Sequence, residues 1–392
     1  MRKNSRPTQN TLAISALSLI YSMGFSVVAL AQDLDFDAPA VEKKKDTPVP
    51  QQVGPVSNIN LGGAIDWRAV YQRGSKRPYA FIHVNEFVVS ANVGEHIAIS
   101  AEQLLLTSEL GSVVGQDHGF VVINLVQLPF LPTGMGVKLG RFRGKFGLDA
   151  QVDSPANIFP SQAVRSNGQV TDIGVSVEYA FNDFELYLEG FNGPDYKSQN
   201  GQKNGALVDK PPLQARLVYQ PVSNAKIGLS GFYGQTWDNQ VNPTVLDMGS
   251  LGSTLESERT IERQRVALDA SYKFPLADLY AEGIYGRDKG RLAQPVDKKY
   301  TLAKGALLRT DVPLFRINDE TSSKIAVQYD AWQDGSYNGR VGFLSTAFSV
   351  LNDEGWTVRL GGTLSDSAFA KTKPESLKKT PWNITSQLLV TF

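Results

Sequence analysis

The last eleven residues of the chain, Trp382 to Phe392, read WNITSQLLVTF. Every second position is apolar, except for Ser386, and the positions between are mostly polar. The apolar set is Trp382, Ile384, Leu388, Val390 and Phe392, and the polar set is Asn383, Thr385, Gln387 and Thr391. Successive side chains of a β-strand point to opposite faces. The stretch therefore predicts a strand with one apolar face and one polar face.

Three other segments show the same alternation. In 260–274, the apolar set is Val266, Leu268, Ala270, Tyr272 and Phe274, and the polar set is Arg263, Arg265, Asp269, Ser271 and Lys273. In 212–220, Leu213, Ala215, Leu217 and Tyr219 alternate with Gln214, Arg216 and Gln220. In 58–72, Ile59, Leu61, Ile65, Trp67 and Tyr71 alternate with Asn60, Asp66, Arg68 and Gln72. Each set of charges shares one face, so that face cannot contact lipid.

From Asn58 onward the chain repeats a unit of about ten strand residues followed by a turn rich in Gly, Pro, Asn and Asp. Sixteen strands are predicted, at 58–72, 79–92, 95–108, 120–130, 134–147, 170–181, 184–192, 212–220, 225–237, 260–274, 277–287, 300–312, 322–333, 337–350, 355–365 and 382–392. An even number of strands is typical of bacterial single-chain barrels with both termini in the periplasm.

The connections between these strands alternate in length. Short turns such as 182–183 follow even-numbered strands, and long loops such as 148–169 follow odd-numbered ones. One pair breaks the rule, because 313–321 is longer than 334–336. Short periplasmic turns and long extracellular loops characterise outer-membrane barrels. We therefore predict an all-β fold, a transmembrane antiparallel β-barrel of about sixteen strands over residues 58–392.

Periodicity alone does not tell a membrane barrel, apolar outside, from a soluble barrel, apolar inside. Aromatic residues favour the membrane barrel, because they gather at strand ends, where an interfacial girdle lies. They are Tyr71, Tyr79, Tyr179, Phe181, Phe274 and Phe392.

The first 57 residues differ from the rest. Residues 1–31 combine an early positive cluster, an uncharged apolar stretch and Ala29-Leu30-Ala31, which predicts a signal peptide cleaved before Gln32. The alternative is an N-terminal membrane anchor. Residues 32–57 mix acidic, basic and proline residues and predict a disordered periplasmic leader. A peptidoglycan contact or a plug inside the barrel is the alternative for the leader.

Composition excludes several classes of protein. The chain has no cysteine, so it has no disulfide framework and no c-type haem site. Without its first 31 residues it carries a formal net charge of −3, which argues against a nucleic-acid partner. No metal site or cofactor is predicted, because His83, His96 and His118 lack metal-ligand spacing. No enzyme is predicted either, since only His118 falls in an outer loop and no serine motif accompanies it.

Two features resemble known families. The terminal aromatic Phe392 on an alternating strand resembles the C-terminal signature of outer-membrane barrels. The run 138–147, KLGRFRGKFG, together with Thr171 to Val175 and 191–193, FNG, resembles consecutive strands of the phosphate-selective porin family. Lys145 and Thr171 depart from that family's usual proline and arginine. The resemblance implies a porin-like channel of the bacterial outer membrane and a homotrimer, and leaves the solute open.

Six cations are candidate pore-lining, anion-attracting residues. Arg141, Arg143 and Lys145 recur at every second position and are predicted to line the lumen about 7 Å apart. Arg216, Arg263 and Arg265 lie on inward-facing positions of other strands. One interpretation is a ladder that lowers the barrier for anions. The other is that the cations pair with inward acids, for which the candidates are Asp172, Glu178, Glu185 and Glu189.

The loop 148–169 is the third extracellular loop. The resemblance implies that it folds into the barrel and narrows it, with Asp149, Asp153 and Arg165 facing the pore. A plain surface loop is the alternative. The other outer loops carry cations between Lys197 and Lys379, which either draw anions to the mouth or bind the phosphates of lipopolysaccharide.

These observations predict an outer-membrane porin, a passive diffusion channel for small hydrophilic solutes with a preference for anions. Its predicted partners are outer-membrane lipid, lipopolysaccharide and small anionic or polar solutes. The alternative is a non-conducting scaffold or sheath around a partner protein, with a filled lumen.

Overall fold

The computed structural model describes most of the region from residue 56 to residue 391. The described residues are 56–72, 77–104, 108–109, 112–113, 120–125, 131–148, 171–193, 210–237, 240–241, 246–247, 250–251, 254–255, 260–290, 300–316, 322–333, 341–353, 356–366 and 382–391. The predicted signal peptide 1–31 and the leader 32–57, apart from its last two residues, lie outside them. The first strand begins at Val56, just before the predicted start of the barrel at residue 58.

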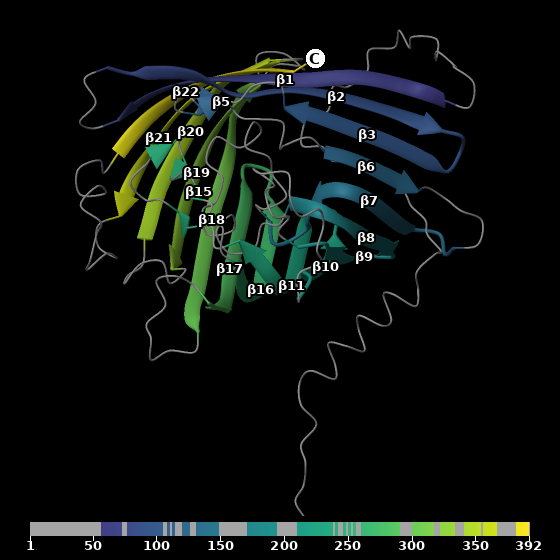
Figure 1. The fold of residues 1–392 in the computed structure, drawn as a ribbon. Coiled ribbons are helices and arrows are strands. Elements are labelled where there is room, and N and C mark those ends of the chain that lie inside the picture. The colour runs from purple at the N-terminus through teal and green to yellow at the C-terminus, as the bar shows by residue number, and fades with distance from the viewer. Residues whose placement is uncertain are drawn as a thin grey trace, which may run out of the picture.

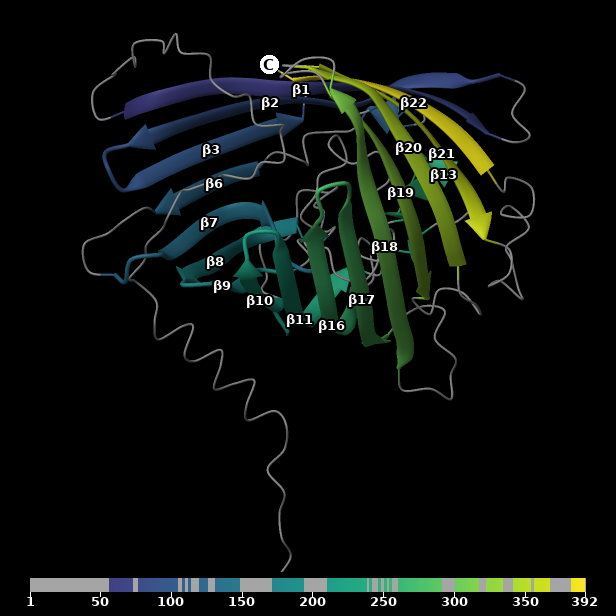
Figure 2. The same cartoon turned by 180° about the vertical axis from the view of Figure 1, so that it is seen from behind.

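Sixteen antiparallel strands of the described residues form one closed barrel. They are β1 (Val56–Gln72), β2 (Tyr79–Val93), β3 (Ile97–Leu104), β6 (Phe120–Leu125), β7 (Met135–Arg143), β8 (Thr171–Phe181), β9 (Phe184–Phe191), β10 (Leu213–Val222), β11 (Ala225–Trp237), β16 (Thr260–Lys273), β17 (Asp278–Lys289), β18 (Thr301–Arg316), β19 (Ser322–Gln333), β20 (Val341–Asp353), β21 (Trp356–Asp366) and β22 (Trp382–Thr391). Each pairs with its neighbour in the chain order, as Figures 1 and 2 show from opposite sides.

Pairing between the first and last strands closes the barrel. The register of β1 and β22 runs from Ala64 opposite Thr391 to Gln72 opposite Asn383. Figure 1 shows the two strands side by side at the top of the barrel. The fold class and the number of strands predicted from the sequence are confirmed. Among the described residues, no helix is long and apolar enough to cross a membrane.

The two faces of the wall have opposite character. On β16, Val266 and Leu268 are 54% and 60% exposed, whereas Ala267 and Asp269 between and beside them are 0% and 3% exposed. The same alternation holds on β1, where Ile65 and Trp67 are exposed and Asp66 and Arg68 are buried. The apolar residues therefore face outward and the charges face the lumen, as a barrel in a lipid bilayer requires.

Aromatic side chains pack in a row at the short-turn end of β8 to β10. Ring centroids are 5.1 Å apart for Tyr179 and Phe181, 5.4 Å for Phe181 and Phe184, and 4.7 Å for Phe184 and Tyr219. The row brackets the tight turn at 182–183, in which Asn182 has a φ of 50°. Asparagine tolerates this left-handed conformation better than most residues. The row matches the predicted interfacial girdle at the periplasmic end.

The structure removes the one exception to the alternation of connections. Strand β18 continues to Arg316 and β20 begins only at Val341. The connection 317–321 is therefore shorter than 334–340, as expected for a periplasmic turn followed by an extracellular loop.

A larger difference from the sequence prediction concerns β7, which ends at Arg143 rather than at residue 147. The outer connections also hold three short hairpins, β4 (Ser108–Glu109) with β5 (Ser112–Val113), β12 (Gln240–Val241) with β15 (Thr254–Leu255), and β13 (Leu246–Asp247) with β14 (Ser250–Leu251).

The outward orientation of Leu268 gives a test of the fold. Leu268→Arg places a cation in the middle of the lipid-facing wall and is expected to lower the free energy of unfolding in lipid vesicles by ~2–4 kcal/mol. Leu276→Arg is the matched control, because Leu276 is 79% exposed in the turn between β16 and β17, and its cost is expected to be about 0–1 kcal/mol. Guanidinium titration measures both, and equal losses would contradict the orientation.

Candidate functional site

The chain leaves the barrel wall after β7 and runs along the inside of the barrel. Three backbone N–H groups of residues 144–148, the lumen segment, donate to side chains of other strands. Lys145 donates to Glu189 on β9 (2.8 Å), Gly147 to Ser230 on β11 (3.1 Å) and Leu148 to Glu282 on β17 (2.8 Å). These strands lie two, four and six places along the barrel from β7. The lumen segment therefore crosses a broad part of the inner wall.

An apolar cluster fixes the lumen segment in place. Phe146 has no exposed surface and belongs to a cluster of buried apolar residues. The other members are Val122, Phe142, Phe191, Phe232, Ala267 and Ile284. The rings of Phe142 and Phe191 lie 5.2 Å apart. Such a cluster on an otherwise polar inner wall gives the chain an anchoring point, since full burial of a Phe contributes ~1.5–3 kcal/mol.

Two glycines allow the close approach of the lumen segment to the wall. Gly147 has a φ of +65°, and a Cβ there would lie 2.2 Å from a carboxylate oxygen of Glu282. A Cβ on Gly144 would lie 2.9 Å from both Gln214 and Phe191. Gly147 requires the absence of a side chain because its backbone is in the left-handed region, whereas a side chain at Gly144 would have to displace Gln214 or Phe191.

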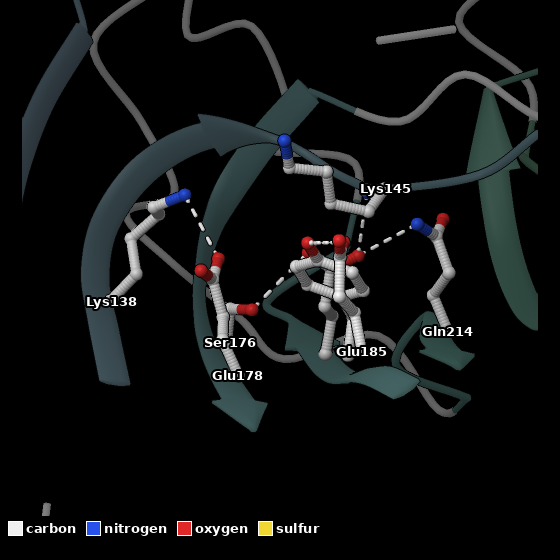
Figure 3. A network of polar contacts seen from close by, with 8 residues as sticks. Lys138, Lys145, Ser176, Glu178, Glu185 and Gln214 are labelled. Atoms are coloured by element: carbon white, nitrogen blue, oxygen red, sulfur yellow. Dashed lines mark hydrogen bonds and ion pairs between the residues drawn. The ribbon is translucent and has the colours of Figure 1, made fainter. Parts of the chain in front are cut away.

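Glu189 is the centre of the polar network that holds the start of the lumen segment. Its carboxylate is 2% exposed and accepts from Gln214 Nε2 (2.7 Å), Ser176 Oγ (3.3 Å) and the Lys145 backbone N–H. Figure 3 shows Lys145 from the lumen segment, and Ser176 and Gln214 from the wall, converging on this carboxylate. Three donors offset much of the cost of burying the carboxylate.

The predicted lumen cations on β10 and β16 are paired with acids. Arg216 forms a two-pronged pair with Asp269, Nη1 to Oδ2 at 2.5 Å and Nη2 to Oδ1 at 2.9 Å. Arg265 lies 2.6 Å and Arg263 3.6 Å from Oδ1 of Asp288. The paired interpretation therefore describes Arg216, Arg263 and Arg265. Their partners are not the acids expected from the sequence.

The acids that were expected as partners have other roles. Glu178 pairs with Lys138 (3.0 Å) and Glu185 pairs with Lys226 (3.3 Å), while Glu189 binds the lumen segment. In the register of β7 with β8, Asp172 lies opposite Phe142. All four face the lumen, but their pairing depends on the strand register, which cannot be read from the sequence.

The predicted ladder on β7 requires a correction. Arg141 and Arg143 share one face, as their spacing predicts, but Arg141 lies opposite Ile173, which is 53% exposed on the outer face. Phe142 takes the lumen-facing position instead, because it packs on Phe191 in the apolar cluster. The alternation thus places Arg141 and Arg143 on the outer face, near the extracellular end of β7.

Lys145 does lie in the lumen, for a different reason than the sequence suggested. It follows the end of β7, where period-two alternation no longer applies, and its Nζ is 5.8 Å from the centre of the Tyr187 ring. Tyr187 lies opposite lumen-facing Arg216. The predicted constriction residues Asp149, Asp153 and Arg165 lie outside the described residues.

A second group of charges lies across the barrel from the lumen segment. Arg68 donates to Asp66 from Nε (2.9 Å) and Nη2 (2.7 Å), and Gln387 links Asp66 (2.9 Å) to Arg359 (3.0 Å). Arg68 and Asp66 lie on β1, which is eight places from β11, the strand of Ser230, in the ring of sixteen strands. We call this group, with the one described next, the basic wall.

On β18 and β19, Asp311 accepts from Arg309 at 2.7 and 2.9 Å and from Lys324 at 3.2 Å. Among the described residues, the basic wall thus contains four cations, Arg68, Arg309, Lys324 and Arg359, and three acids, Asp66, Asp311 and Asp330, the last of which is 4% exposed on the lumen face of β19. Alternation in 58–72 predicts Arg68 on the inner face. The inward positions of Arg309, Lys324 and Arg359 were not predicted, although alternation over 300–312, 322–333 and 355–365 indicates polar faces there. In the described part of the chain, no group of three or more His, Cys, Asp or Glu side chains is arranged to hold a metal ion.

Gly147→Ala tests the docking of the lumen segment. The added methyl group meets Glu282 and a left-handed backbone, so the segment is expected to shift off the wall and change the single-channel conductance. Gly283→Ala is the control, because a Cβ there meets nothing within 4 Å. An unchanged conductance in Gly147→Ala, measured in planar bilayers, would contradict the docking.

The Arg216–Asp269 pair predicts a second outcome. Arg216→Met leaves Asp269 buried without its cation and is expected to cost about 3–5 kcal/mol of unfolding free energy. Adding Asp269→Leu in the same chain is expected to recover most of that loss, since both charges are then gone. Guanidinium unfolding of the two variants measures the difference. A double variant no more stable than Arg216→Met would argue against the pairing.

Comparisons with known proteins agree with this geometry at the level of the fold. No family model matches the chain, and neither does any curated protein. Among solved structures, this chain is similar to the anion-selective porin from Comamonas acidovorans. The match covers 86% of this chain and 99% of that porin, with a TM-score of 0.55 and 11% sequence identity. In vitro folded OmpT of Vibrio cholerae, in its trimer form, has a TM-score of 0.56 at 8% identity, covering 86% of this chain and 99% of its own.

The outer membrane channel DcaP of Acinetobacter baumannii covers 86% of this chain and 97% of its own, with a TM-score of 0.52 and 12% identity. At such low identity these likenesses show the fold and not the solute. None of these three is described as phosphate-selective. The chain therefore has the fold of bacterial outer-membrane porins, a closed antiparallel β-barrel with an apolar outer face and a polar lumen.

Proposed function

We propose that this protein is a passive diffusion channel of the bacterial outer membrane for small hydrophilic solutes. The observation that carries the proposal is the lumen segment, which lies inside the barrel on Glu189, Ser230 and Glu282 and leads into residues 149–170. A barrel of sixteen strands encloses an aqueous lumen wider than its own side chains fill. A segment held on one wall would narrow such a lumen.

The charges of the lumen would orient a solute as it passes. Among the described residues, the basic wall has one more cation than acids. Its Arg68 on β1 lies six places along the ring from Glu189 on β9 and from Glu282 on β17, the carboxylates on which the lumen segment rests. Charges of opposite sign on facing walls produce a field across the pore, which acts strongly where the local dielectric constant is low. A dipolar solute would align with that field, and an apolar solute has no dipole with which to do so.

We further propose that the channel prefers anions to cations. The surplus of cations on the basic wall supports it, and the similar Comamonas acidovorans protein is described as an anion-selective porin. Pairing of Arg216, Arg263 and Arg265 with Asp269 and Asp288 argues for a weak preference, because the fields of close ion pairs largely cancel at a distance. Phosphate as the solute rests only on the motifs at 138–147, 171–175 and 191–193.

The assembly is proposed to be a homotrimer embedded in outer-membrane lipid and lipopolysaccharide. One similar structure, OmpT of Vibrio cholerae, is described in a trimer form. Light scattering of the detergent-solubilised protein after chromatography measures the mass of the assembly directly.

Zero-current potentials in a planar bilayer under a salt gradient test the proposal. We expect open conductance and a small anion-selective potential that falls in Lys324→Gln and Arg359→Gln, each of which removes a cation from the basic wall. Arg141→Gln is the control, since the register places Arg141 on the outer face, and its potential is expected to match the unmodified protein.

Three results would change the proposal in distinct ways. A loss of anion selectivity in Arg141→Gln alone would restore the ladder on β7. A cation-selective potential would leave a general porin without the anion preference. No conductance from the folded protein would favour the alternative of a non-conducting scaffold barrel. Inhibition of the chloride current by added phosphate tests the phosphate motifs in the same apparatus.

A further inference from the structure

A cluster of cations lies on the outer face of the barrel, away from the lumen. Gln264 pairs in register with Arg287, and Tyr285 with Lys304, on the positions that alternate with buried lumen residues such as Arg265 and Asp288. Arg287, Lys289 and Lys304 are exposed. They cannot contribute to a pore site, because the wall separates them from the lumen.

The cluster sits at the extracellular ends of its strands. The short turn 274–277 joins the other ends of β16 and β17, which places Arg287, Lys289 and Lys304 at the loop end. Figure 2 shows β16, β17 and β18 side by side in this part of the wall. The exposed apolar belt begins directly below, at Val266 (54%) and Leu268 (60%). This is the depth of the headgroups of the outer leaflet.

Aromatic rings support two of the cations. The Arg287 guanidinium is 5.4 Å from the centre of the Tyr300 ring, and Lys304 Nζ is 5.7 Å from that of Tyr285. Arg287 also donates from Nε to Gln264 (2.7 Å). These contacts hold the Arg287 side chain in one orientation. The rings are themselves exposed, Tyr285 by 58% and Tyr300 by 44%, as expected of aromatic residues at a membrane interface.

The charge of the cluster is not balanced. Glu262 is its acid; it accepts from Lys210 (2.5 Å) and Tyr233 (3.4 Å) and lies opposite Lys289 in the register. The same carboxylate raises the pKa of Lys210, which precedes β10. Among the residues that the structure describes, Lys210, Arg287, Lys289 and Lys304 therefore face one acid, a surplus of three positive charges at the edge of the lipid. Cations at this depth are favourable when they meet lipid phosphate.

We propose that this rim cluster binds the phosphate groups of lipopolysaccharide in the outer leaflet, with Arg287 and Lys304 as the main contacts. The inference rests on the proposed function only in that the barrel spans the outer membrane. Arg287 offers a planar fork suited to a phosphate, and Lys304 lies on the neighbouring strand about 7–8 Å away as a diagonal neighbour. The acyl chains of the same lipid would cover Val266, Leu268 and Leu302.

Native mass spectrometry of the detergent-solubilised full-length barrel tests this site. The probe is short-chain lipopolysaccharide, titrated onto the unmodified protein, Arg287→Gln/Lys304→Gln and the control Lys226→Gln/Lys273→Gln. The control removes the same charge from lumen-facing positions near the periplasmic end. We expect the rim variant to bind at least about tenfold more weakly than the other two. Equal affinity in all three proteins would overturn the proposal.

Two further measurements identify the chemical group that the rim cluster binds. Enzymatically dephosphorylated lipopolysaccharide is expected to bind the unmodified protein as weakly as intact lipid binds the rim variant, and millimolar inorganic phosphate is expected not to displace the lipid. Retained binding after dephosphorylation, or full displacement by phosphate, would overturn the assignment to a lipid headgroup. A change in the number of barrel copies instead of bound lipid would assign the surface to a second copy of this chain.

Folding and channel function are checked separately. The shift in gel mobility between heated and unheated samples reports whether each variant folds, and Arg287→Lys, which keeps the charge, is expected to retain most of the binding. Conductance of the unmodified protein decides the proposed function on its own. If the protein conducts but its affinity for lipopolysaccharide is unchanged when Arg287 and Lys304 are substituted, only this inference is refuted.

Discussion

Closure of the barrel by backbone hydrogen bonds between β1 and β22 is the constraint on which the rest of the structure depends. In a bilayer, an unpaired strand edge would leave N–H and C=O groups without water or partner, at a cost of several kcal/mol each. The register from Ala64 opposite Thr391 to Gln72 opposite Asn383 removes that edge. Once the ring is closed, alternation gives each strand one face toward lipid and one toward the lumen.

The polar inner face has consequences for the contents of the barrel. Side chains such as Arg216 and Asp269, which are 4% and 3% exposed, are kept from lipid and must find partners across the wall. Most of the described lumen charges meet an opposite charge or a backbone N–H group. The carboxylates of Glu189 and Glu282 use part of their hydrogen-bonding capacity to hold the lumen segment. The same residues therefore belong to the inner wall and hold the lumen segment against it.

The sequence predicted the fold well, because periodicity and turn chemistry are local. The faces of 58–72, 212–220, 260–274 and 382–392 were all assigned as the structure has them. The candidate site was predicted less well, because the face on which Arg141 and Arg143 lie depends on their register with Thr171 and Ile173. Period two shows that two residues share a face but not which face that is. The end of β7 at Arg143 depends on Phe146 and the distant Glu282, which no local pattern connects.

The most direct test of the central claim, that the chain leaves the wall after Arg143 and enters the lumen, uses the absence of native cysteine. The measurement is the single-channel current of Lys145→Cys during addition of a water-soluble charged thiosulfonate, with Arg141→Cys as the reference. The account predicts a stepwise change in current for Lys145→Cys and none for Arg141→Cys. A change for Arg141→Cys with none for Lys145→Cys would contradict it.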